Sequence, residues 1–198
     1  ERCQPACSSI YEYNSSEIWV FDIETIIEDG EETAGVKTEA GNRIIPIHKT
    51  LIDLGLLEYR DDVMRHKHRR LFPDLNRTGR GIYGAQPGKQ FGTIVAEVIP
   101  EPKCKTFYSL RHNFADFYAG HDLQNAKFRQ LFGHSPETLA EKQYGKPAEP
   151  DALYHELIEK LDYSLELSHL MNSRFRVYAP EKRKGDGKQP GKKSRGGA

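Results

Sequence analysis

The change in apolar periodicity near His48 constrains the fold of this 198-residue chain more than any other feature. Before it, residues 17–27 are rich in β-branched and aromatic types, which predicts a strand. Residues 36–38 and 43–47 flank the turn 39–42 as the strands of a β-hairpin would. Beyond His48, apolar residues recur at spacings of three and four, which is typical of helices with one buried face. We therefore predict one domain of the α+β class, mainly α, with a small antiparallel sheet and a helix-rich remainder.

Proline, glycine and acidic residues predict the breaks in the first half. Pro46 confines its strand to a sheet edge or ends it. The acidic residues 28–35 and the glycine-rich residues 77–88 are expected to form loops. Three helices are expected next. The first carries Leu51, Leu54 and Leu57, and the second begins at Val63 and Met64. The third ends before Pro100 and carries Phe91, Ile94, Val95 and Val98.

Capping residues predict the helices of the second half. Ser109 suits the N-cap of a helix that Gly120 ends, and Asp122 suits the N-cap of one that Gly133 ends. Ser135, Pro136 and Glu137 are typical of a further helix start. Leucines at 153, 157, 161 and 165 repeat every four residues, so residues 151–169 are expected to form one long amphipathic helix.

The net charge of zero conceals a basic C-terminal segment. From Glu181 onward, seven lysines and arginines oppose two acidic residues, so this segment carries +5 and residues 1–180 carry −5. We expect residues 171–198 to be a basic tail, disordered from Pro180 because glycine, lysine and proline dominate there. Any affinity of the body for nucleic acid must therefore come from a local patch.

Composition also excludes several classes of protein. No apolar run approaches the roughly 18–20 residues that cross a bilayer, and no secretory signal pattern is present, so we expect a cytoplasmic protein. The cysteines at positions 3, 7 and 104 are expected to be reduced structural thiols; a metal at Cys3 and Cys7 is the weaker alternative. We predict no metal site.

The spacing of an arginine, a histidine and a tyrosine predicts the chemistry. Arg111 follows Ser109-Leu110, His134 follows Gly133, and Tyr144 comes ten residues after His134. Phosphodiester transfer needs a cation on the non-bridging oxygens, a nucleophile and a proton donor for the leaving sugar oxygen. The guanidinium of Arg111 can bind two oxygens at once, Tyr144 can attack, and Lys37 on the hairpin can supply a proton.

These motifs together resemble the catalytic domain of the tyrosine recombinases, the phage-type integrases. The resemblance covers residues 1–170 and rests on Val36-Lys37-Thr38, Arg43-Ile44-Ile45-Pro46-Ile47-His48, Leu71-Phe72-Pro73, Phe107-Tyr108-Ser109-Leu110-Arg111-His112-Asn113-Phe114-Ala115-Asp116, Leu131-Phe132-Gly133-His134-Ser135 and Tyr144. It implies a helix-rich catalytic domain that inserts or excises a mobile element. The implied partners are double-stranded DNA attachment sites and further copies of the protein on that DNA, with no small-molecule substrate.

The resemblance also implies a role for each motif residue. Lys37 is similar to the general acid, Arg111 to the second phosphate-binding arginine and His134 to the histidine that contacts the scissile phosphate. Tyr144 is similar to the nucleophile, which forms a 3′-phosphotyrosyl link and frees a 5′-hydroxyl without metal or cofactor. The DNA-binding residues that we expect are His112 beside the site, together with Arg43, Arg69 and Arg70.

Two departures from the family pattern qualify the implied activity. Tyr108 occupies the position where the motif usually has a histidine, and a phenol is a poor base near neutral pH. The family's first arginine falls before Glu1, so we expect a fragment or decayed copy of the enzyme. A catalytically impaired remnant that only binds DNA is therefore the alternative function.

Each motif residue also has an ordinary structural interpretation. Arg111 can pair with Asp116, His134 can cap a helix end, and Lys37 can be a solvated turn residue. Residues 65–70 are expected first to be a solvated helix face, then a phosphate contact, and least a metal site. The helix at 151–169 is expected to cover its own core, with docking on a neighbouring protomer as the alternative.

Overall fold

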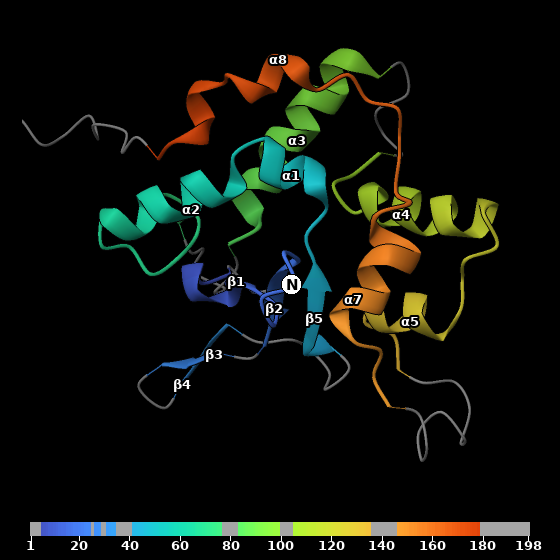
Figure 1. Ribbon diagram of the computed structural model, residues 1–198. Coiled ribbons are helices and arrows are strands. Elements are labelled where there is room, and N and C mark those ends of the chain that lie inside the picture. Colours follow the sequence, from blue (N-terminus) through green and yellow to red (C-terminus); the bar gives the residue numbers. More distant parts are fainter. Residues whose placement is uncertain are drawn as a thin grey trace, which may run out of the picture.

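The computed structural model describes residues 5–24, 26–28, 31–34, 41–76, 83–99, 105–135 and 146–178. Within these ranges the protein is a mainly helical α+β fold with a small three-stranded antiparallel sheet. Figure 1 shows this sheet at the centre, with helices on both sides of it. The predicted fold class is confirmed at this level.

The sheet has the order β1-β2-β5 and is antiparallel throughout. Strand β1 spans Ile10–Glu12, β2 spans Trp19–Ile23 and β5 spans Arg43–Pro46. Pro46 pairs with Val20 as the last residue of the edge strand β5, where the missing N–H of proline is tolerated. The prediction for Pro46 is confirmed.

A second, two-stranded sheet corrects the loop that we predicted at 28–35. Strand β3 spans Ile26–Glu28, β4 spans Glu31–Ala34, and Glu28 pairs directly with Glu31. The acidic composition was misleading, because the Asp29-Gly30 dipeptide between the paired residues is a strong signal for a two-residue hairpin loop. The strand expected at 36–38 lies outside the described residues.

Helices α1 and α2 meet at a glycine rather than near Val63. Helix α1 spans Lys49–Asp53, and the Nδ1 atom of His48 caps it by accepting from the N–H of Thr50 at 3.1 Å. Gly55 has φ 96°, a conformation that glycine adopts without strain, and α2 follows as Leu56–Arg65. Val63 is therefore a buried residue within α2, and the helix start predicted there is wrong.

Helix α3 spans Ala85–Val98, so it begins inside the segment that we predicted as a loop. Its described end agrees with the stop expected before Pro100.

The caps of the next two helices differ from the predicted ones. Helix α4 spans Ser109–Gly120 with Tyr108 as its N-cap, and the Ser109 hydroxyl accepts from the N–H of Thr106 at 3.0 Å. Helix α5 spans Ala126–Phe132 and is capped by Asn125, whose side chain accepts from the N–H of Phe128 at 3.1 Å. Asp122 is not the cap, because the chain turns there with φ 54°. Gly133 ends α5 as predicted.

The long helix expected at 151–169 is interrupted. Helix α7 spans Pro150–Leu153, a π-helical turn (η4) spans Tyr154–Ile158, and residues 161–167 are not helical. A short helix α8, Ser168–Met171, and a 3₁₀ turn (η5), Arg174–Arg176, complete this part. The leucine repeat was misleading because only its first half is used: Leu153 and Leu157 are fully buried, whereas Leu165 is 67% exposed.

Two apolar clusters form the core; strand β5 packs against the first, and Ile47, the residue that follows β5, belongs to the second. The first cluster consists of Tyr118, Phe128, Leu131, Phe132, Leu153, Leu157 and Ile158, with Ile45 of β5 packed against it. The second consists of Cys7, Ile10, Ile47, Val63, Leu71 and Tyr178. In Figure 1, α4, α5 and α7 lie on one side of β5, and α2 lies on the other. The consecutive residues Ile45 to Ile47 thus connect the two clusters along the chain.

The described helices include none that is long and apolar enough to cross a membrane.

Replacing Tyr118 with phenylalanine tests the polar contact at the centre of the first cluster. The Tyr118 side chain is fully buried, and its hydroxyl donates to the carbonyl of Leu157 at 3.0 Å. The same carbonyl also accepts from the N–H of Lys160 at 3.3 Å, so Tyr118→Phe removes one of its donors, and we expect a loss of about 0.5–1.5 kcal/mol in the free energy of unfolding. Urea unfolding measures the loss. An unchanged midpoint would show that the hydroxyl contributes nothing.

Burial of tyrosines predicts a loss of stability at alkaline pH. Desolvation raises the pKa of Tyr59 to about 12 and also raises the pKa of Tyr118. An unfolded tyrosine titrates near pH 10, so above that pH the folded state holds more protons than the unfolded state. The contribution of these tyrosines to the free energy of unfolding is therefore complete below about pH 10, and it declines as the pH rises further. Urea unfolding from pH 8 to 11.5 should show this decline, with a smaller decline in Tyr118→Phe than in the control Tyr108→Phe.

Candidate functional site

The C-terminal end of α5 fixes the position of His134. Gly133 has φ 75° and donates its N–H to the carbonyl of Gln130 at 3.1 Å. His134 donates its own N–H to the carbonyl of Arg129 at 2.9 Å, which completes a Schellman-type end. The backbone of His134 is therefore bonded to the helix that it follows, while its side chain is exposed.

Two arginines from distant segments contact this same helix end. Arg43 of β5 donates its Nε–H to the carbonyl of Leu131 at 3.1 Å. Arg111 of α4 donates an Nη2–H to the adjacent carbonyl of Phe132 at 3.0 Å. The last carbonyls of a helix lack partners within it and form the negative end of its dipole, so both cations are stabilising there.

Arg111 and His134 form a pair over one aromatic ring. Arg111 Nη2 lies 3.4 Å from His134 Nε2, and the Arg111 guanidinium carbon lies 3.7 Å from the centroid of the Phe132 ring. The imidazole of His134 meets the same ring edge-on at 4.8 Å between centroids. Both nitrogens can donate hydrogen bonds to a shared anion once the imidazole carries its proton on Nε2. The pair is thus chemically suited to hold two oxygens of a phosphate.

Arg43 acts as a bridge between chain segments. Besides Leu131, it donates an Nη1–H to the carbonyl of Gly41 at 2.7 Å. A Cβ atom placed on Gly133 would lie 3.0 Å from the Cζ and Nη1 atoms of Arg43. Gly133 is therefore required both for its positive φ and for the close approach of this guanidinium. We predicted a DNA contact for Arg43 and did not predict the bridge, because Leu131 is 88 positions away in the sequence.

Tyr108 and His112 lie together on the first turn of α4. Tyr108 is 62% exposed, and its ring meets the exposed His112 ring edge-on at 5.2 Å. Within the part of the chain that the structure describes, no bond joins either side chain to Arg111 or His134. Lys37 and Tyr144, the expected general acid and nucleophile, lie outside the described residues.

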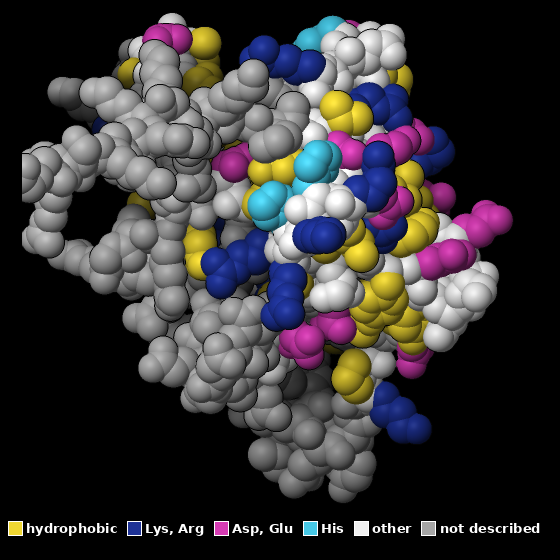
Figure 2. Space-filling view, turned by 90° about the vertical axis from the view of Figure 1, so that its left-hand side faces the viewer, with side chains coloured by type: hydrophobic (Ala, Val, Ile, Leu, Met, Phe, Trp, Pro, Cys, Tyr) yellow, Lys and Arg dark blue, Asp and Glu magenta, His cyan; other side chains and the backbone are white. Residues whose placement is uncertain are grey.

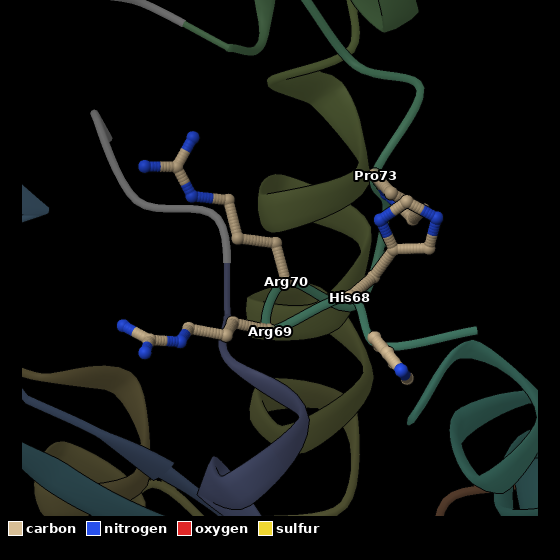
Figure 3. A pocket seen from close by; sticks show the side chains of 5 residues that line it. His68, Arg69, Arg70 and Pro73 are labelled. Carbon is tan, nitrogen blue, oxygen red and sulfur yellow. The ribbon is translucent and has the colours of Figure 1, made fainter. Parts of the chain in front are cut away.

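Arg69 and Arg70 lie at a separate place, beyond the end of α2. They line an open cavity of about 320 Å³ together with Lys67, His68 and Pro73 (Figure 3). Helix α2 ends at Arg65 and Lys67 has φ 61°, so residues 66–70 are not the helix face that we expected first.

The two histidines of this segment contact an aromatic ring. His66 and His68 meet the ring of Tyr178 edge-on, at 5.5 and 5.3 Å between centroids. Among the described residues, no group of three or more His, Cys, Asp or Glu side chains could hold a metal ion. Nearby Cys7 is buried, and desolvation raises the pKa of its thiol.

Comparison of this chain with protein-family models, with curated proteins and with solved structures found no match.

Gly133→Ala tests the close approach of Arg43 to the end of α5. We expect a loss of about 1–2 kcal/mol in the free energy of unfolding from the left-handed backbone alone, and a further loss from the collision with Arg43. The collision is absent in an Arg43→Ala background, so Gly133→Ala should cost less there. Urea unfolding of the four variants gives this coupling.

Gly92→Ala is the matched control for this cycle. Gly92 lies in α3 with nothing within 4 Å of an added Cβ, so we expect a gain of about 0.5–1 kcal/mol. Equal costs of Gly133→Ala with and without Arg43 would contradict the proposed contact.

Proposed function

We propose that this protein cleaves and rejoins DNA strands in site-specific recombination or integration, with Arg111 and His134 holding the scissile phosphate. The observation that supports this most is the 3.4 Å approach of Arg111 Nη2 to His134 Nε2. The two residues are 23 positions apart in the chain and share the end of α5. Arg111 could bond the end of α5, and His134 could follow it, without the two side chains lying next to each other at the surface.

The step at this site is a transfer of a phosphoryl ester. The phenol of Tyr144 releases its proton to solvent, its oxygen attacks the phosphorus atom, a 3′-phosphotyrosyl bond forms, and the bond to the 5′-oxygen breaks. Arg111 and His134 offset the negative charge that develops on the non-bridging oxygens. Lys37 gives a proton to the leaving 5′-oxygen, and the hydroxyl attacks in reverse to rejoin a strand. One ester replaces another, so the proposal needs no cofactor.

A DNA-binding protein without cleavage is the second candidate. It is favoured by Tyr108, which stands where the resembling family has a histidine and whose exposed ring packs on His112. In both candidates, duplex DNA is the partner, and several copies are proposed to assemble on it.

A randomised duplex library tests the chemistry without a known target site. Each duplex carries a bridging sulfur in place of one 5′-oxygen, because the thiolate released by cleavage rejoins poorly. We expect detergent-resistant adducts between the parent chain and DNA and none with Tyr144→Phe. Arg111→Ala should lower adduct formation by about 10²–10³, as removal of one donor to a developing oxyanion does.

The sulfur substrate also isolates the role of Lys37. A thiolate leaves without receiving a proton, so Lys37→Ala should keep adduct formation on this substrate and lose it on ordinary DNA. Equal adducts from Tyr144→Phe and the parent would show that another residue is the nucleophile. DNA binding without any adduct would instead select the binding-only candidate.

A further inference from the structure

The cavity beyond α2 is lined by an unusual concentration of positive charge. Lys67, Arg69 and Arg70 contribute to it within four consecutive positions, and among the described residues no carboxylate lines it. Figure 3 shows the side chains of Arg69 and Arg70 extending to the same side of the segment, with His68 and Pro73 on the other. Like charges held this close repel one another, so a bound anion would lower the energy of the arrangement.

The carboxylates of the surrounding segments have other partners. Asp62 is buried and pairs with Arg65 at 2.9 Å, and Asp74 accepts from the Tyr178 hydroxyl at 3.3 Å. Within the described ranges, the exposed side chains of Lys67 and Arg69 have neither a hydrogen bond nor an ion pair. These two cations are therefore available to an external ligand.

The backbone of the cavity is held in place by its neighbours. The carbonyl of Arg69 accepts from the N–H of Cys7 at 2.8 Å, and Leu71 donates to the carbonyl of Pro5 at 3.0 Å. The Arg70 guanidinium donates to the Tyr83 hydroxyl and lies 5.0 Å from the centroid of that ring. The charges are thus attached to an ordered segment, which reduces the entropy lost when a ligand binds.

The basic C-terminal sequence continues from a residue that lies against this segment. Tyr178 is buried between His66 and His68, and Arg176 pairs with Glu58 of α2 at 2.8 Å. The seven lysines and arginines that follow Glu181 begin at Lys182, four residues beyond Tyr178. Figure 2 shows histidines and several lysines and arginines on the face that carries the end of α2, with carboxylates among them.

We propose that the cavity lined by Lys67, Arg69 and Arg70 binds phosphate groups of the DNA backbone, at a site separate from Arg111 and His134. The identity of the ligand as DNA rests on the proposed function, whereas the affinity for phosphate groups follows from the cavity itself. Such contacts position a duplex without reading its sequence.

The salt dependence of DNA binding tests this site. Binding of a labelled duplex is measured by fluorescence anisotropy at several KCl concentrations for the full chain and for Lys67→Gln/Arg69→Gln. Each neutralised phosphate contributes about 0.9 to the slope of log K against log[KCl], so we expect the slope to fall by about 2 and the affinity to drop at least about 10-fold near 0.1 M salt. Because both side chains are exposed, the variant should melt at the temperature of the parent.

A matched variant controls for the change in net charge. Lys49→Gln/Lys160→Gln also removes two exposed positive charges, one in α1 and one after η4, and should leave the slope within error of the parent. Equal slopes in the cavity variant and this control would overturn the cavity as a phosphate contact and leave the proposed chemistry standing. Adduct formation in the sulfur-library assay reports on that chemistry separately.

A second experiment distinguishes a free oligophosphate from DNA as the ligand of the cavity. Titration with tripolyphosphate is followed by calorimetry for the same variants. The proposal would be overturned if the parent bound tripolyphosphate tightly, the cavity variant lost this binding, and the salt slope of DNA binding were the same in both. The ligand would then be a free oligophosphate. Weak tripolyphosphate binding with a reduced DNA slope supports it. An absence of DNA binding by the parent at low salt would contradict both this proposal and the proposed function.

Discussion

The end of helix α5 is the point on which the candidate site depends. Its last carbonyls need donors that the helix cannot supply, and the donors come from Arg43 of β5 and Arg111 of α4. One short helix therefore fixes the relative positions of a sheet edge and a second helix. Because Gly133 carries no side chain, the Arg43 guanidinium can lie against the chain at the turn that precedes His134.

A structural role and a binding role are compatible for Arg111. One Nη2–H contacts the carbonyl of Phe132, while the guanidinium lies over the Phe132 ring beside His134. A cation that is already held by a helix end and a ring loses little side-chain entropy when an anion arrives. The contact to Phe132 would thus orient the arginine for a ligand rather than compete with it.

Charge on this molecule is organised locally rather than globally. The chain is neutral overall, yet the described residues that line the cavity at Lys67, Arg69 and Arg70 include no carboxylate. It lies beside the second apolar cluster, whereas Arg111 and His134 lie beside the first. Screening by salt limits the field of each group of charges to its own neighbourhood.

The sequence by itself determined the class of fold, a strand within residues 17–27, the proline at the sheet edge and the glycine that ends α5, because these follow from local periodicity and backbone preference. It did not determine that the helical part of the leucine repeat ends at Ile158, because a repeat says nothing about which residues find a partner to pack against. Nor did it determine that Arg43 bridges Gly41 and Leu131. Only the tertiary structure decided those contacts, since an unsatisfied helix end takes its donors from whichever segments folding brings within reach.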